Sequence, residues 1–131
     1  MPSRIVKQVI VMRKDLNMRK GKMIAQGAHA SIAFLTQHAT VEGHTFQTHI
    51  RNPEEVTEWI TKGFTKICLS VDSEEDLDRI YRQAVENGLN AALVTDSGLT
   101  EFGGVPTKTC CAIGPDLNEE IDRITKDLKL L

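Results

Sequence analysis

Apolar and polar positions along the chain repeat with two periods, one typical of strands and the other of helices. Residues 4–13, RIVKQVIVMR, are rich in β-branched residues and predict a first strand. Residues 22–37, KMIAQGAHASIAFLTQ, have helical character, and their small residues allow a helix to lie close against a sheet. The polar segment 39–51 is predicted to be a loop or a frayed helix end. The rest of the pattern predicts a helix at 54–62, a strand at 64–71, a helix at 72–88, strands at 89–96 and 108–114, and a helix at 116–128.

This order of elements predicts a single α/β domain over residues 1–131, a length that suits one hydrophobic core. Strands joined through helices are expected to run parallel by right-handed crossovers. The fourth strand follows the third after a loop of about a dozen residues, which favours an antiparallel arrangement. We therefore expect a small mixed four-stranded sheet, with three strands parallel, one antiparallel, and helices on both faces.

The composition argues against a membrane-spanning or disulfide-rich protein. No stretch is long and apolar enough to cross a bilayer, and the first residues alternate like a strand instead of forming the apolar block of a signal peptide. We therefore expect a cytoplasmic protein. The cysteines are Cys68, Cys110 and Cys111, and the adjacent pair is expected on opposite faces of one strand. All three are predicted to be reduced core residues.

Charge is distributed unevenly along the chain, although the formal net charge is only -2. The first 22 residues hold seven Lys or Arg against one Asp, a net charge of +6, and the remainder holds nine against seventeen, a net charge of -8. Such asymmetry is compatible with a face that meets a polyanion. On charge alone, an ordinary solvated surface is the simpler interpretation.

Four side chains that are distant in sequence are predicted to converge at the carboxyl edge of the parallel strands, where α/β sheets place their functional groups. Asp96 ends the third strand, and Lys22 begins the helix after the first strand. Thr100 lies in the glycine-rich loop after Asp96, and Thr109 opens the fourth strand. Each has a simpler structural role when taken singly, such as turn formation by Asp96, so only their convergence indicates a site.

Two further polar side chains, Gln26 and His29, lie at i+4 and i+7 from Lys22 and are expected on the same helix face. The other three histidines lack the spacing of metal ligands, so no metal site is predicted. The chain also lacks P-loop, dinucleotide-binding and serine-hydrolase motifs.

Two long stretches resemble the type 2 peptidyl-tRNA hydrolases of archaea and eukaryotes. Residues 9–30 read VIVMRKDLNMRKGKMIAQGAHA, which is similar to that family's strand, K-G-K turn and A-A-Q-x-x-H-A helix. Residues 95–115 read TDSGLTEFGGVPTKTCCAIGP, which is similar to its D-x-G-x-T loop, T-x-T pair and G-P end. Two long motifs in the right order are more specific than any short pattern. The resemblance covers nearly the whole chain.

By position, the resemblance implies a catalytic group of Lys22, Asp96, Thr100 and Thr109. Members of the family hydrolyse the ester between a peptide and the 3′-terminal ribose of tRNA, without a metal or another cofactor, and many are dimers. The expected partners are therefore peptidyl-tRNA and, in a homodimer, a second copy of the chain. Gln26 and His29 are candidates to support the catalytic group. The cations expected to meet tRNA phosphates at the mouth of the site are Arg13, Lys14, Arg19 and Lys20.

Two departures from the family pattern keep a second hypothesis open. Arg19 stands where members commonly have glycine, in MRKGK instead of MGKGK, and the loop between Thr100 and Thr109 is one residue longer. The longer loop is able to shift Thr109 relative to Asp96, and a misplacement of about 1 Å costs roughly a hundredfold in rate. The alternative is therefore a catalytically weak homologue that binds tRNA or a protein.

Overall fold

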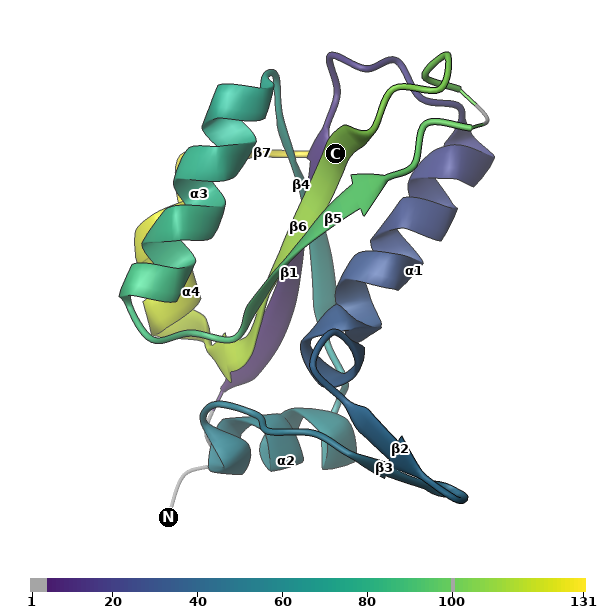
Figure 1. Ribbon diagram of the computed structural model, residues 1–131. Helices are drawn as coiled ribbons and strands as arrows, with labels where there is room; N and C mark the ends of the chain where they lie inside the picture. The colour runs from purple at the N-terminus through teal and green to yellow at the C-terminus, as the bar shows by residue number, and fades with distance from the viewer. Residues whose placement is uncertain (1–4, 100) are drawn as a thin grey trace.

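Figure 1 shows a twisted sheet with helices on both sides in the computed structural model, which describes residues 5–99 and 101–131. The elements are β1 (Val6–Arg13), α1 (Lys20–Thr36), β2 (Thr40–Glu42), β3 (Thr45–Gln47), α2 (Pro53–Thr61), β4 (Lys66–Val71), α3 (Glu74–Glu86), β5 (Ala91–Asp96), β6 (Thr107–Leu117), α4 (Asn118–Thr125) and β7 (Lys129–Leu130).

The main sheet has the strand order β5-β6-β1-β4-β7. β1 pairs in parallel with β4, and β6 is antiparallel both to β1 and to β5. β1, β4 and β5 therefore run in one direction and β6 runs against them, which confirms the predicted set of three parallel strands and one antiparallel strand. The fifth strand, β7, was not predicted, because its two residues are too few to produce a pattern. It pairs antiparallel with the edge of β4.

Both faces of the sheet carry a hydrophobic core, as predicted. α1 packs on one face over Ile10, Met12 and Cys110, whereas α3 and α4 pack on the other over Val11 and Cys111. The adjacent cysteines thus point to opposite faces of β6 because side chains alternate along a strand. None of the described helices combines the length and apolar character that are needed to cross a membrane.

Three expectations about local structure were wrong. The segment 39–51 contains the short β2–β3 hairpin and is not merely a loop or a helix end. The last helix begins at Asn118, because β6 continues its ladder with β1 as far as the Val6–Leu117 pair. Cys68 is exposed, unlike the two buried cysteines, because it lies on β4 where α1 leaves that face of the sheet uncovered. All three cysteines are free thiols.

Candidate active site

The ends of three elements meet beside the N-terminal turn of α1. Asp96 is the last residue of β5, Lys22 lies in the first turn of α1, and Thr109 lies near the start of β6. The Lys22 Nζ atom is 2.9 Å from Asp96 Oδ1, and both side chains are mostly buried, with 14% and 13% of their surface exposed. A lysine there faces the positive end of the helix dipole, so the carboxylate compensates a charge that the helix itself disfavours.

Asp96 accepts hydrogen bonds on both carboxylate oxygens. The backbone N–H of Gly98 donates to Oδ2 at 2.8 Å, and Gln26 Nε2 donates to Oδ1 at 3.2 Å. The hydrogen bond from the Lys22 ammonium is the main cause that holds the pKa of Asp96 below its usual range, with the Gly98 N–H second. Asp96 is therefore a fixed, ionised carboxylate at neutral pH.

Thr109 joins the group through Gln26. Its hydroxyl donates to Gln26 Oε1 at 2.5 Å, and this orients the Gln26 amide so that its Nε2 faces Asp96. Thr109 and Gln26 are both buried. The longer loop has therefore not removed Thr109 from the Asp96 cluster. Thr100 lies outside the described residues.

The loop after β5 contributes two features that the sequence did not predict. Gly98 has a φ of +84°, and its carbonyl accepts from the N–H of Gly104 at 2.8 Å, so the loop closes on itself while the Gly98 N–H points to Asp96. The Phe102 ring lies with its centroid 5.6 Å from Lys22 Nζ, a cation–π distance. The clustered glycines indicated a turn but not which N–H would bind the carboxylate.

His29 lies on α1 beyond Gln26 and is exposed. In the described hydrogen bonds of the cluster, Lys22 and Gln26 donate to Asp96 and Thr109 donates to Gln26, and none of these bonds involves His29. His29 is therefore not part of this hydrogen-bonded cluster.

The predicted tRNA-binding cations have two different environments. Arg13 is 9% exposed, and its guanidinium donates to the Asp15 carboxylate at 2.6 and 3.1 Å and to the Lys108 carbonyl at 3.0 Å. It therefore fastens the turn after β1 to β6. The other three cations are exposed: Lys14, Arg19 and Lys20. The side chain of Arg19 is 91% exposed, and its Nε atom is 3.8 Å from Glu101 Oε1.

The cysteines of β6 are unsuited to nucleophilic attack although Cys110 touches the cluster. Burial raises the pKa of Cys110 to about 11 and raises that of Cys111 further. The Cys110 thiol donates to the Gln26 carbonyl at 3.4 Å. Among the described residues, no three His, Cys, Asp or Glu side chains come together as metal ligands would.

Comparison with known proteins agrees with the motifs and the geometry. The family model for peptidyl-tRNA hydrolase PTH2 matches residues 6–131. A peptidyl-tRNA hydrolase of Methanocaldococcus jannaschii is 42% identical over 96% of this chain and all of the relative. One of Methanopyrus kandleri is 44% identical over 95% of this chain and 97% of the relative. The chain therefore belongs to the PTH2 family of peptidyl-tRNA hydrolases.

Proposed function

We propose that the protein hydrolyses the ester bond of peptidyl-tRNA and releases free tRNA and a peptide. The observation that carries the proposal is the buried Lys22–Asp96 ion pair, which Gln26 links to Thr109. The archaeal relatives are named peptidyl-tRNA hydrolases, which supports the proposal. We also propose that the protein acts in the cytoplasm, where translation would supply this substrate.

In the proposed reaction, the oxygen of a water molecule bonds to the ester carbonyl carbon. The bond from that carbon to the ribose oxygen breaks, and a proton from the water ends on the ribose oxygen. A carboxylate with a lowered pKa is a weak base, so Asp96 acts mainly by orienting the water. The Lys22 ammonium holds Asp96 ionised and stabilises negative charge on the carbonyl oxygen. Thr109, and Thr100 by its position in the motif, place the reacting groups.

The tRNA is proposed to approach over the turn before α1. Lys14, Arg19 and Lys20 supply exposed positive charge there, and Arg13 holds the turn in place. α1 has no acidic residue in its first turn and no side-chain cap, so its dipole adds to this positive potential.

Turnover of purified peptidyl-tRNA tests the proposal. We expect release of peptide and deacylated tRNA at a rate that Asp96→Ala reduces at least a hundredfold, a loss in the range for a positioned catalytic group. Release no faster than in a heat-treated control would contradict the enzyme hypothesis. Retained tRNA binding in that case would favour the alternative, a weak homologue that acts as a binding module.

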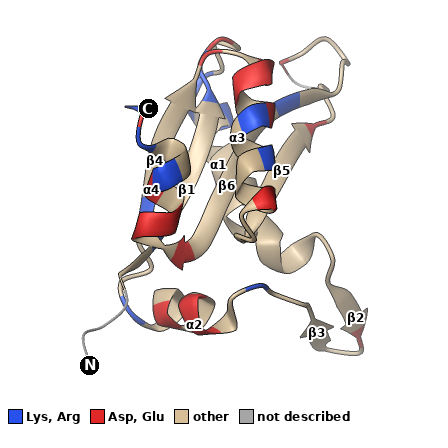
Figure 2. Cartoon of the chain, turned by 90° about the vertical axis from the view of Figure 1, so that its left-hand side faces the viewer, with Lys and Arg blue, Asp and Glu red and all other residues tan. Residues whose placement is uncertain are grey.

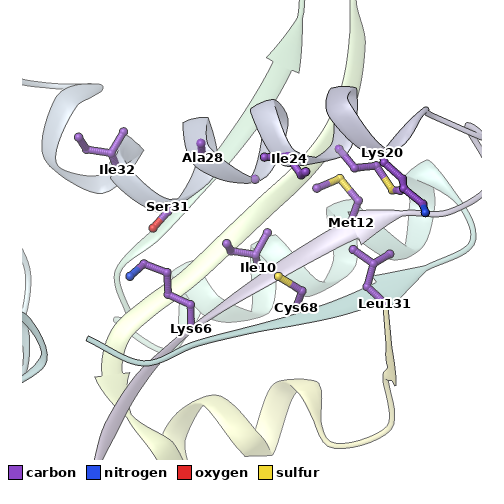
Figure 3. A pocket seen from close by; sticks show the side chains of 12 residues that line it. Ile10, Met12, Lys20, Ile24, Ala28, Ser31, Ile32, Lys66, Cys68 and Leu131 are labelled. Atoms are coloured by element: carbon purple, nitrogen blue, oxygen red, sulfur yellow. The ribbon is translucent and has the colours of Figure 1, made fainter. Parts of the chain in front are cut away.

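We also propose that two copies of the chain associate through the uncovered side of α1. A groove of about 640 Å³ lies between α1 and the strands β1 and β4, with Lys20 near one end and Lys66 near the other (Figure 3). Ile24 and Ile32 flank Ala28 along α1, and both isoleucines are more than half exposed. An antiparallel crossing about Ala28 would place Ile24 of each copy opposite Ile32 of the other, which suits a two-fold interface.

The dimer is tested by sedimentation at micromolar concentration and by alkylation of Cys68, which lines the groove. We expect a wild-type dimer with a protected Cys68, and an Ile24→Glu monomer whose Cys68 reacts faster. Ile60→Glu is the matched control, because Ile60 is a half-exposed isoleucine on α2 outside the groove. A wild-type monomer, or a dimer unaffected by Ile24→Glu, would rule out this interface.

A further inference from the structure

A polar pocket of about 200 Å³ lies at the end of α1 and β5 that is far from Asp96. Its walls come from the C-terminal end of α1, from the segment before α2, from α3 and from the start of β5. Its polar side chains are Gln37, His38, His49, Arg51, Tyr81 and Asn90. The described residues that line it include no carboxylate. A pocket with arginine, histidine and hydroxyl donors and no acid suits an anion.

Arg51 is held at its backbone while its side chain is left available. The buried Asn90 side chain donates to the Arg51 carbonyl at 2.8 Å and accepts from the Arg51 N–H at 3.2 Å. Asn90 is itself fixed, because its own N–H donates to Asp116 at 2.8 Å. Within the described part of the chain, none of the ion pairs made by arginine side chains involves Arg51. A guanidinium on a fixed backbone, with no carboxylate paired to it, is a strong phosphate ligand.

The pocket and the candidate active site are connected along one side of the molecule. β5 and α1 run in opposite directions beside each other, so each reaches from one site to the other (Figure 1). Ala91 lines the pocket and Asp96 lies in the active site, five steps apart on β5, or about 17 Å at 3.3–3.4 Å per residue. Neither α1 nor residues 89–95 contain an Asp or Glu. A polyanion that follows α1 and β5 therefore meets no carboxylate of these two segments before Asp96.

We propose that this pocket binds a backbone phosphate of the tRNA, a few nucleotides from the ester, with Arg51 as its principal ligand and His49 beside it. The inference rests on the proposed function, which places the 3′ end of the RNA at Asp96. Phosphate contacts set the position of a nucleic acid on a protein without reading its sequence. Arg51 and His49 thus position the substrate, and their contacts do not depend on the sequence of the tRNA.

The test uses RNA oligonucleotides of increasing length that carry the same peptidyl ester at the 3′ end. For the wild type, KM should fall about tenfold at the length at which the RNA first reaches the pocket. For Arg51→Ala, KM should not fall at this length, and kcat should be unchanged. The slope of log affinity against log salt concentration for the long substrate should be lower by about 0.7 to 0.9 in this variant. Arg51→Lys should recover part of the effect. Arg82→Ala, an exposed arginine on α3 outside the pocket, is the matched control.

The same length dependence in Arg51→Ala and in the wild type would overturn the inference while leaving the proposed function intact. If the wild type hydrolysed none of the substrates, the proposed function would fail instead. Binding of the deacylated RNAs would then decide the inference separately. A length-dependent affinity that Arg51→Ala removes would support the phosphate site, and equal affinities would refute it.

Discussion

Lys22 keeps Asp96 ionised, and the ion pair fixes the direction of both side chains. The ammonium lowers the pKa of the carboxylate, and the carboxylate compensates a lysine at the positive end of α1. We predict that Lys22→Ala and Asp96→Ala each lower kcat/KM for peptidyl-tRNA at least a hundredfold, and that the double variant is little worse than either. Steady-state kinetics of the three proteins measures this. Losses that multiply would show that the two residues act in separate steps.

At the scale of residues, the sequence predicted where side chains lie in the fold better than it predicted their partners and exposure. Asp96 and Lys22 were expected to converge because strand ends of one direction share an edge of the sheet, and their ion pair shows that they do. Arg13 pairs with Asp15 because the turn after β1 brings the two side chains together. The pattern of apolar and polar residues does not predict this turn geometry. Cys68 was predicted to be a core residue. It is exposed because α1 does not extend over that part of the sheet.

The loop after β5 acts as one element that aims the Gly98 N–H at Asp96. A Cβ at Gly98 would overlap the backbone of Val105, and its φ of +84° disfavours any side chain. We predict that Gly98→Ala opens the loop and lowers kcat/KM at least tenfold, since Asp96 loses a hydrogen bond. Gly103→Ala is the control, because Gly103 also has a positive φ but has open space for a Cβ. Equal effects of the two changes would mean that backbone strain, and not the Gly98 contact, matters.

A buried carboxylate joins α2, β5 and β6 on the side away from the active site. Asp116 Oδ2 accepts from the Asn90 N–H at 2.8 Å and its Oδ1 accepts from Asn52 Nδ2 at 2.6 Å. Asn52 precedes the first residue of α2, but its side chain makes this contact and does not cap the helix. Burial without a cation raises the pKa of Asp116 to about 6, against about 3.9 for an unfolded chain.

This raised pKa predicts the direction of a pH effect on stability. Between pH 4 and pH 6 the folded chain holds a proton on Asp116 that the unfolded chain has released, so this contribution to stability is lost as the pH rises. The free energy of unfolding of the wild type relative to Asp116→Asn should fall by up to about 3 kcal/mol across this interval. Urea denaturation at several pH values measures it, with the exposed Asp127→Asn as control. A constant difference would mean that Asp116 is already ionised at pH 4.

The elements that the sequence missed are those without an apolar face. β2 and β3 are three exposed residues each, so alternation could not distinguish them from a loop. The predicted helices and long strands all have a buried side that leaves a period in the sequence, and their order was enough to predict the sheet. Contacts across the sheet, such as the pairing that extends β6 to Leu117, lie beyond a local pattern.

At the scale of the whole molecule, the fold separates the charges that the sequence segregates. Eleven of the eighteen Asp and Glu lie in α2, α3 and α4, and α1 has none. Figure 2, which looks onto α3, shows acidic residues on these three helices. The sheet therefore stands between the acidic helices α3 and α4 on one face and α1 on the other. A chain with a net negative charge is thus able to offer a polyanion one favourable approach.

This separation leads to a prediction about the salt dependence of tRNA binding. Each cation that contacts a phosphate releases counterions and adds about 0.7 to 0.9 to the slope of log K against log salt. The double change of Arg19→Ala with Lys20→Ala should weaken binding and lower that slope by about 1.4 to 1.8. Filter binding of deacylated tRNA at several salt concentrations measures both quantities.

Arginines on the acidic side supply the matched control for this experiment. Arg79 and Arg123 form ion pairs with Asp76 and Glu120 on their own helices, and replacing both with alanine removes the same total charge. If docking occurs on the side of α1, that control should shift affinity only slightly and leave the slope unchanged, since the phosphates do not reach it. Equal slopes for the two double variants would show that net charge alone governs binding and that the tRNA has no preferred side.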